Sequence, residues 1–255
     1  MLILVCPAQE SSVPVTTLTT ISAVDRESTG LQAVLLDLDG TLVDTEDFWW
    51  EAESGLLADL GHPLDPAERQ VVVGGPMSRV VAHLLAVTGA PLTAAEFGPM
   101  INDRFAELVG RGVPVRPGAL ELLDALAAAG IPTALVTASH RRIIDLVLRT
   151  TLGAHRFAFS VAGDEVARTK PHPDPYLVAA ARLGVDPARC VVVEDSPTGV
   201  ASGEAAGCRM VVVPSVTPVG PAPGRTVLAS LEQLDVALLR ALVPAAEALA
   251  DGQSR

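Results

Sequence analysis

The chain alternates short apolar runs with amphipathic segments from residue 117 onward, and this alternation constrains the fold more than any other feature. The apolar runs are too short for helices, whereas the segments between them repeat apolar residues at helical spacing. Repeated strand and helix units of this kind specify a doubly wound parallel sheet, a Rossmann-like α/β fold. We expect strands at Thr133–Thr137, Phe157–Val161, Cys190–Glu194 and Arg209–Val213, and helices near Ala119–Ala129, Arg141–Leu148, Asp174–Leu183 and Thr198–Ala206.

An earlier apolar run, residues 33–37, ends in an acidic turn and is typical of a buried parallel strand. Between residues 45 and 112 the apolar residues recur at helical spacing, as in Val80 with Leu84, and breaks rich in Gly and Pro separate about four helices. The sequence therefore predicts an α/β core made of residues 31–44 and 113–255. An all-helical cap at residues 45–112 interrupts this core.

The two ends of the chain lack the alternating pattern. Residues 1–30 contain a stretch rich in Ser and Thr without helical periodicity, so we predict a flexible N-terminal leader. Toward the other end, the Pro-rich residues 214–223 indicate a connecting loop, and Leu231–Ala250 is expected to form one more amphipathic helix.

Composition narrows the range of partners. The 255 residues carry a formal net charge of -12 and show no basic stripe, so we do not expect a nucleic acid as partner. No apolar run is long enough to span a bilayer, so we expect no membrane partner. Cys6, Cys190 and Cys208 cannot all pair, and the last two adjoin apolar runs, which is typical of reduced core thiols in a cytoplasmic protein. The sequence does not indicate an oligomeric state.

Four polar clusters lie where predicted strands, or the loops after them, end. They are Asp37-Leu-Asp39-Gly-Thr41, Thr137-Ala-Ser139, Lys170-Pro-His-Pro-Asp and Glu194-Asp195-Ser196. An open α/β sheet binds its ligand at this edge. Each cluster alone is weak evidence, since a lone D-x-D-G also occurs in solvated turns and calcium loops. The four clusters in this order indicate an active site.

The first cluster supplies two carboxylates that can share one substrate, because the turn at Gly40 brings them together. We expect Asp37 to attack phosphorus and form an aspartyl phosphate, and Asp39 to act as general acid and then as general base. A carboxylate attacking a phosphate dianion meets strong repulsion, which a divalent cation relieves. Asp37 and Asp195 offer the hard oxygen ligands that Mg²⁺ prefers.

These motifs, in this order and at these strand ends, resemble those of the haloacid dehalogenase superfamily, and in particular its phosphatase branch. The inserted helices look like the cap of the beta-phosphoglucomutase and phosphoglycolate phosphatase group. The resemblance implies that the Asp39 backbone carbonyl also ligates Mg²⁺ and that Glu194 can join directly or through water. Lys170 would balance negative charge, and Thr137 with nearby backbone N–H groups, including that of Ala138, would hold the phosphoryl oxygens.

The expected reaction is hydrolysis of a small phosphate monoester, such as a sugar phosphate or a phosphoglycolate-sized acid. Asp39 favours this reaction over carbon–halogen cleavage, because the resemblance implies that relatives with the latter activity usually lack that acid. A phosphomutase and a noncatalytic metabolite-binding protein are the alternatives. The resemblance implies a His in such mutases at the position of Trp49, which counts against the mutase. Trp49 and Arg79 are candidate substrate contacts from the cap.

Overall fold

A parallel six-stranded sheet forms the centre of the protein, with the strand order β3-β2-β1-β4-β5-β6. The computed structural model describes residues 30–72 and 77–245, so the predicted leader lies outside the described residues except for Gly30. The strands are β1 (Ala33–Leu36), β2 (Thr133–Val136), β3 (Phe159–Val161), β4 (Cys190–Glu194), β5 (Arg209–Val212) and β6 (Arg225–Val227). This sheet confirms the predicted Rossmann-like α/β class.

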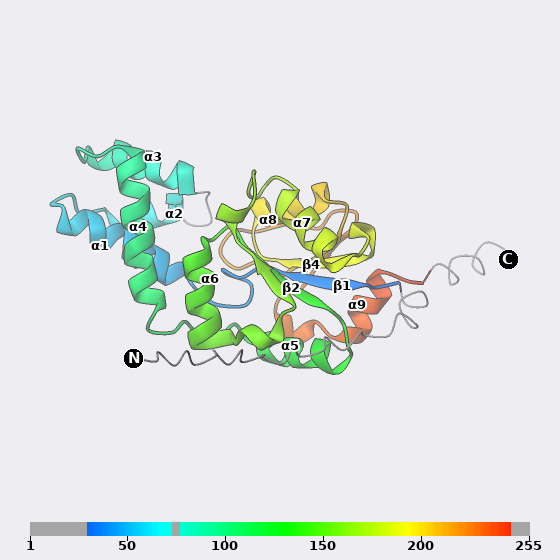
Figure 1. The fold of residues 1–255 in the computed structure, drawn as a ribbon. Helices are drawn as coiled ribbons and strands as arrows, with labels where there is room; N and C mark the ends of the chain where they lie inside the picture. The colour runs from blue at the N-terminus through cyan, green and yellow to red at the C-terminus, as the bar shows by residue number, and fades with distance from the viewer. Residues whose placement is uncertain (1–29, 73–76, 246–255) are drawn as a thin grey trace, which may run out of the picture.

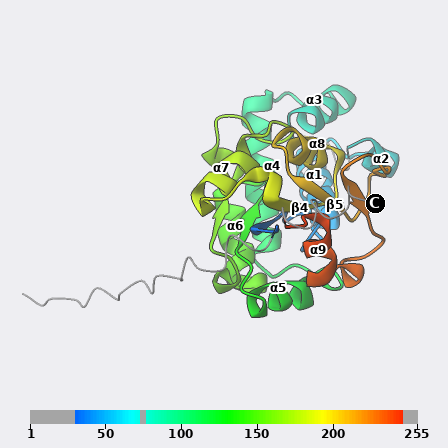
Figure 2. The same cartoon turned by 90° about the vertical axis from the view of Figure 1, so that its right-hand side faces the viewer.

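Helices cover both faces of the sheet (Figures 1 and 2). On one side lie α5 (Ala119–Ala128) and α9 (Val236–Leu242), and on the other lie α7 (Asp174–Leu183) and α8 (Pro197–Ala205). Alternate residues of β1 enter the two layers: Val34 and Leu36 belong to one apolar cluster, while Ala33 and Leu35 belong to the other. All four side chains are fully buried, which explains why this strand reads as a continuous apolar run.

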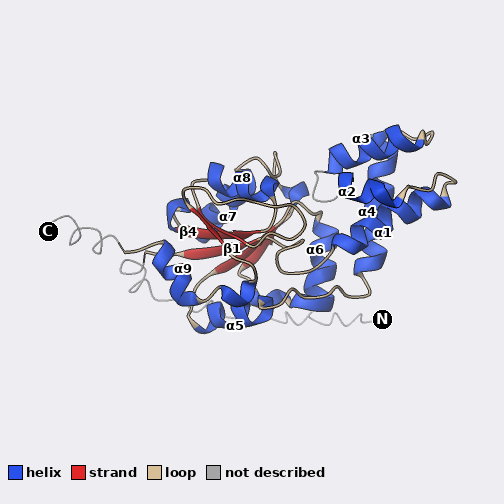
Figure 3. Cartoon of the chain, turned by 180° about the vertical axis from the view of Figure 1, so that it is seen from behind, coloured by secondary structure: helices blue, strands red, loops and turns tan. Residues whose placement is uncertain are grey.

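The inserted stretch is helical, as predicted, and its helices gather at one end of the sheet (Figure 3). Trp49 and Phe105 stack face to face between the first and last of these helices, with ring centroids 3.6 Å apart. The helices are α1 (Glu46–Asp59), η2 (Pro66–Glu68), α2 (Arg69–Val72), α3 (Met77–Thr88) and α4 (Ala94–Val109). The division of the chain into a core and a cap at residues 45 and 112 stays a prediction.

The chain enters and leaves this helical stretch at one place. Val43 and Val115 form an isolated antiparallel bridge. The Asp44 N–H donates to the Pro114 carbonyl at 2.8 Å, and the Arg116 N–H donates to the Leu42 carbonyl at 2.9 Å. The two connections therefore run side by side.

The C-terminal part differs from the prediction. The expected helix over Leu231–Ala250 is replaced by a short turn, η7 (Leu231–Gln233), and by α9, which ends at Leu242. Asp235 is extended and its side chain caps the N-terminus of α9, so the helix starts anew there. Pro244 has no N–H and restricts the residue before it, which ends the helix. Residues 246–250 lie outside the described residues.

The remaining short elements connect the larger ones. Strand β6 was not predicted, because its three residues are too few to show a period. Helix α6 (Arg141–Val147) follows β2 and continues into η3 (Leu148–Leu152). The others are η4 (Ala154–Arg156), η5 (Gly163–Glu165) and η6 (Pro187–Arg189).

Two observations bear on the environment of the protein. Cys190 and Cys208 are buried free thiols, and burial raises the pKa of each to about 12, so both stay in the neutral form. Across residues 30–72 and 77–245, no helix has the length and apolar character to cross a bilayer. The cytoplasmic location stays a prediction.

Candidate active site

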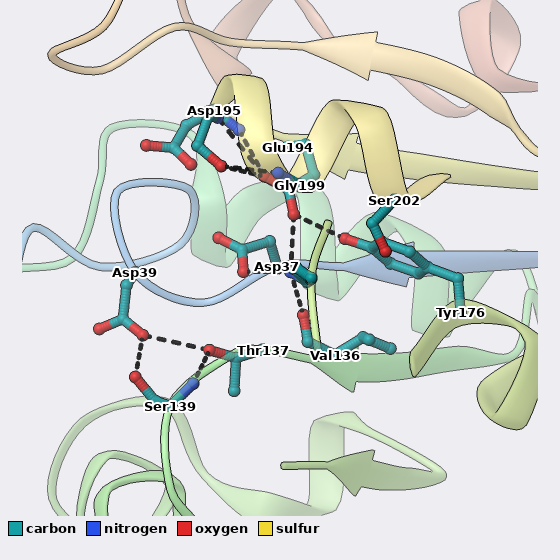
Figure 4. A network of polar contacts seen from close by, with 12 residues as sticks. Asp37, Asp39, Val136, Thr137, Ser139, Tyr176, Glu194, Asp195, Gly199 and Ser202 are labelled. Atoms are coloured by element: carbon teal, nitrogen blue, oxygen red, sulfur yellow. Dashed lines mark hydrogen bonds and ion pairs between the residues drawn. The ribbon is translucent and has the colours of Figure 1, made fainter. Parts of the chain in front are cut away.

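The sheet brings the four polar clusters together. Strands β2 and β4 flank β1 in the sheet, so the residues that follow these three strands meet at one edge. A cavity of about 260 Å³ lies at this edge. Residues from all four clusters line it: Asp37, Asp39, Thr137, Ala138, Ser139, Lys170, Asp195 and Ser196. Figure 4 shows the polar network around Asp37.

Lys170 anchors the deepest part of this network. Its ammonium donates to Asp37 Oδ1 at 2.7 Å, to Glu194 Oε1 at 2.6 Å and to the carbonyl of Val136 at 2.8 Å. Burial alone would lower the pKa of Lys170, but the Asp37 and Glu194 carboxylates raise it above its ordinary value. Lys170 is therefore a permanent cation beside the predicted nucleophile.

Glu194 has hydrogen-bond partners at both of its carboxylate oxygens. Oε1 accepts from Lys170 and, at 2.7 Å, from the Tyr176 hydroxyl. Oε2 accepts from the Asp195 N–H and from the Ser196 hydroxyl, each at 3.2 Å. A Cβ on Gly199, in the first turn of α8, would collide with this carboxylate, so the glycine leaves the space that Glu194 occupies. Glu194 orients Lys170, and its predicted part in metal binding stays a prediction.

Asp37 and Asp195 offer oxygen atoms suited to a divalent cation. One carboxylate oxygen from each of Asp37, Glu194 and Asp195 lies within 4.8 Å of the others. Asp37 Oδ2 is buried and has no hydrogen-bond partner among the described residues. Burial, followed by the charge of Glu194, raises the pKa of Asp37 to about 7 despite Lys170, and burial and Asp37 raise that of Asp195 well above its ordinary value. A cation would keep both ionised, so these residues fit Mg²⁺.

The carboxylate of Asp39 accepts hydrogen bonds from three hydroxyl groups, and Figure 4 shows two of them, those of Thr137 and Ser139. Its Oδ2 accepts from Ser139 at 2.7 Å and from Thr137 at 3.2 Å. Its Oδ1 accepts from Thr45 at 2.8 Å. In this structure the Thr137 hydroxyl, predicted to bind phosphate, therefore binds Asp39.

The inserted helices line the rest of the cavity. Trp49 lines the cavity, as expected of a substrate contact. It also stacks on Phe105 and so packs α1 against α4. Arg79 is exposed on α3 and is not among the lining residues. The other lining residues of this part are Glu46, Trp50, Glu53, Val72, Met77, Val80 and Asn102.

The sequence profile of the haloacid dehalogenase-like hydrolases matches residues 31–207. The chain belongs to this family. It is 34% identical over 195 residues to protein CbbY of Rhodobacter capsulatus, covering 72% of this chain and 86% of the relative. It is 37% identical over 187 residues to hexitol phosphatase A of Escherichia coli K12, with 72% of this chain and 84% of the relative covered.

A solved structure is also similar. CbbY from Rhodobacter sphaeroides in complex with xylulose-(1,5)bisphosphate superposes with a TM-score of 0.73 at 30% identity, covering 82% of this chain and 99% of the other. The present chain is an enzyme of the phosphatase branch of the haloacid dehalogenase family, as its four motifs predicted. Magnesium dependence and an aspartyl-phosphate intermediate are typical of that family, and the buried acidic cluster agrees with them.

Within this haloacid dehalogenase site, several contacts were not predicted. Ser139 was part of a recognised motif, and its distance of two residues from Thr137 could have suggested a shared partner. Glu46 and Glu53 lie seven residues apart with Trp49 between them, so the helical period places all three on one face of α1. Tyr176 gave no signal, because its contact with Glu194 depends on how α7 packs on the sheet.

Proposed function

We propose that this protein hydrolyses a small phosphate monoester, either a sugar phosphate or a phosphoglycolate-sized acid, with the help of Mg²⁺ and through an aspartyl phosphate on Asp37. The observation that carries the proposal is the unpartnered oxygen Oδ2 of Asp37, at the base of the cavity and beside the Lys170 ammonium. The similarity to hexitol phosphatase A supports a sugar or polyol phosphate as substrate.

The chain's own residues account for the first half of the reaction. Asp37 Oδ2 attacks phosphorus while the bond from phosphorus to the ester oxygen breaks. The departing alkoxide takes a proton from Asp39, and Lys170 stabilises negative charge on the phosphoryl group. Mg²⁺, held by Asp37, Asp195 and the Asp39 carbonyl, would reduce the repulsion between carboxylate and phosphate.

The second half regenerates the enzyme. Asp39, now ionised, removes a proton from water as the water oxygen attacks phosphorus. The bond between phosphorus and Asp37 breaks, so inorganic phosphate leaves and both carboxyl groups return to their starting state. Asp39 must leave its hydroxyl partners to reach the ester oxygen, and Thr137 is then free to bind a phosphoryl oxygen, together with the Ala138 N–H.

Phosphate release from a panel of phosphorylated metabolites, with Mg²⁺ or with EDTA, tests this proposal. We expect metal-dependent release that falls at least about a thousandfold in Asp37→Asn, because the variant has lost its nucleophile. Asp59→Asn, an exposed carboxylate at the end of α1, is the matched control and should keep full activity. Release that continues in Asp37→Asn would contradict the mechanism.

Two other outcomes identify the alternatives. A bisphosphorylated intermediate that returns its phosphate to the sugar would identify a phosphomutase. Tight binding of a phosphorylated metabolite without turnover would identify a noncatalytic binding protein. The tryptophan at position 49 counts against the first alternative, and the complete set of Asp37, Asp39, Lys170 and Asp195 counts against the second.

A further inference from the structure

The cavity has a second polar feature besides the phosphate-binding residues. Its walls in the helical insertion are mostly apolar, formed by Trp49, Trp50 and side chains of α2 and α3. Three polar side chains interrupt these walls: the carboxyl groups of Glu46 and Glu53 on α1, and the amide of Asn102 on α4. This part of the cavity faces the leaving group of a substrate whose phosphate lies near Asp37.

Glu53 is buried, with 5% of its surface exposed, and it lines the cavity. Among the described residues no hydrogen bond or cation acts on its carboxyl group, in contrast to the fully paired Glu194. Burial, followed by the charge of Glu46, raises the pKa of Glu53 to about 7. A buried carboxyl group without a partner is costly, and a ligand that donates hydrogen bonds would offset this cost.

The cations of the cavity lie elsewhere. Within the described chain, the basic side chains that line it are Lys170 and His140, which belong to the phosphate-binding end. Arg69 forms an ion pair with Asp47 and is not a lining residue of this cavity. A second anionic group on the substrate would therefore meet Glu46 and Glu53, and Arg69, the cation whose charge acts on Glu46, is already paired with Asp47.

We propose that Glu53 binds hydroxyl groups of the leaving group, and that the enzyme therefore selects monophosphates of uncharged sugars or polyols. Where Glu53 is ionised, its charge excludes carboxylates and second phosphates, which removes phosphoglycolate-like acids from the range given above. Trp49 and Trp50 provide apolar surface for the C–H groups of the same substrate. This inference rests on the proposed function and specifies its substrate class.

A matched pair of substrates tests the inference. Sorbitol 6-phosphate and 6-phosphogluconate differ at the end remote from phosphate, where one has a hydroxymethyl group and the other a carboxylate. We expect kcat/KM to favour sorbitol 6-phosphate by at least about tenfold, the effect of one hydrogen bond to a charged group. The dissociation constants of both compounds for Asp37→Asn, measured with Mg²⁺ by calorimetry, should differ in the same direction.

The substitution Glu53→Gln isolates the carboxylate. It should reduce the preference for sorbitol 6-phosphate about tenfold, mainly through KM. Glu51→Gln changes the same charge on the exposed side of α1 and should leave the preference unchanged. Circular dichroism of both variants verifies that the helices are intact.

The failures are distinguishable. Equal kcat/KM for the two compounds, or a preference that Glu53→Gln does not alter, overturns the inference, while hydrolysis of these phosphate monoesters still supports the proposed function. If no phosphate is released from any compound, the proposed function fails. The two dissociation constants measured by calorimetry for Asp37→Asn then test the inference. Equal dissociation constants, or binding of neither compound, overturn it.

Discussion

The two ends of the cavity differ in whether their buried carboxyl groups have partners within the protein. At the phosphate-binding end, Lys170 joins Asp37 and Glu194, and both oxygens of Glu194 have protein partners. At the other end, Glu53 is also buried, but no hydrogen bond or cation from the described residues acts on its carboxyl group.

The paired groups serve the phosphoryl-transfer reaction, whereas the group without a partner serves the choice of substrate. The paired groups come from strand ends and from the loop that carries Lys170, so the sheet fixes their geometry before any substrate binds. The unpaired group comes from a helix of the insertion, where a ligand can complete its hydrogen bonds.

The largest effect is expected from Lys170→Met. Without the ammonium, the buried carboxylates of Asp37 and Glu194 lose their shared cation, so the free energy of unfolding should fall by about 3–5 kcal/mol at pH 8. Activity should be lost as well. Urea unfolding followed by circular dichroism measures the change, and Arg168→Met, an exposed cation in the same loop, should have little effect. An unchanged midpoint for Lys170→Met would show that the network does not stabilise the fold.

The next effect is selective for the leaving group. Asp39→Asn should slow hydrolysis of alkyl phosphates by about 10²–10⁴-fold, because their alkoxide needs a proton. Acetate, the leaving group of acetyl phosphate, needs no proton. Formation of the aspartyl phosphate from acetyl phosphate should therefore be slowed much less. Rapid-quench measurement of that first step separates the two halves of the reaction. Asp44→Asn, exposed nearby, is the control; equal losses on both substrates would argue against proton transfer by Asp39.

The smallest effect concerns Glu53 and depends on pH. Its pKa is about 7 in the folded protein and 4.5 ordinarily, so between these values the folded state holds a proton that the unfolded state releases. Stability therefore falls as pH rises through this window, by about 3 kcal/mol at most. Glu53→Gln should be more stable than the parent protein at pH 8 and equal to it at pH 4.5.

Urea unfolding in EDTA at both pH values measures this difference. Glu51→Gln should show no such pH dependence, because Glu51 is exposed. A gap between Glu53→Gln and the parent that stays constant with pH would indicate that Glu53 has a partner in the folded state.

The sequence was most informative where a residue's position on a strand decides its neighbours. Asp37, Thr137 and Asp195 follow three strands of one parallel sheet, so predicting the strands was enough to place these residues at the same edge. That the three strands are neighbours came from the structure. The apolar runs of β1 and β4 were recognisable because both faces of these strands are buried.

Side-chain partners were harder to predict. The rotation of Asp39 toward Thr45 and Ser139 depends on the path of the loop after β1, which no local pattern encodes. The restart of the C-terminal helix at Asp235 depended on a single cap within an otherwise continuous apolar period. The roles of individual site residues stay proposals until the variants are measured.

The bridge between Val43 and Val115 has a consequence for how such enzymes diversify. Because the chain leaves the sheet and returns to it at one point, the helices between these residues can be lengthened, shortened or exchanged without altering the separation of the strands. Mutations that change Glu53 or its neighbours are then largely insulated from the nucleophile. Substrate preference can therefore change through the inserted helices while the residues that transfer the phosphoryl group stay the same.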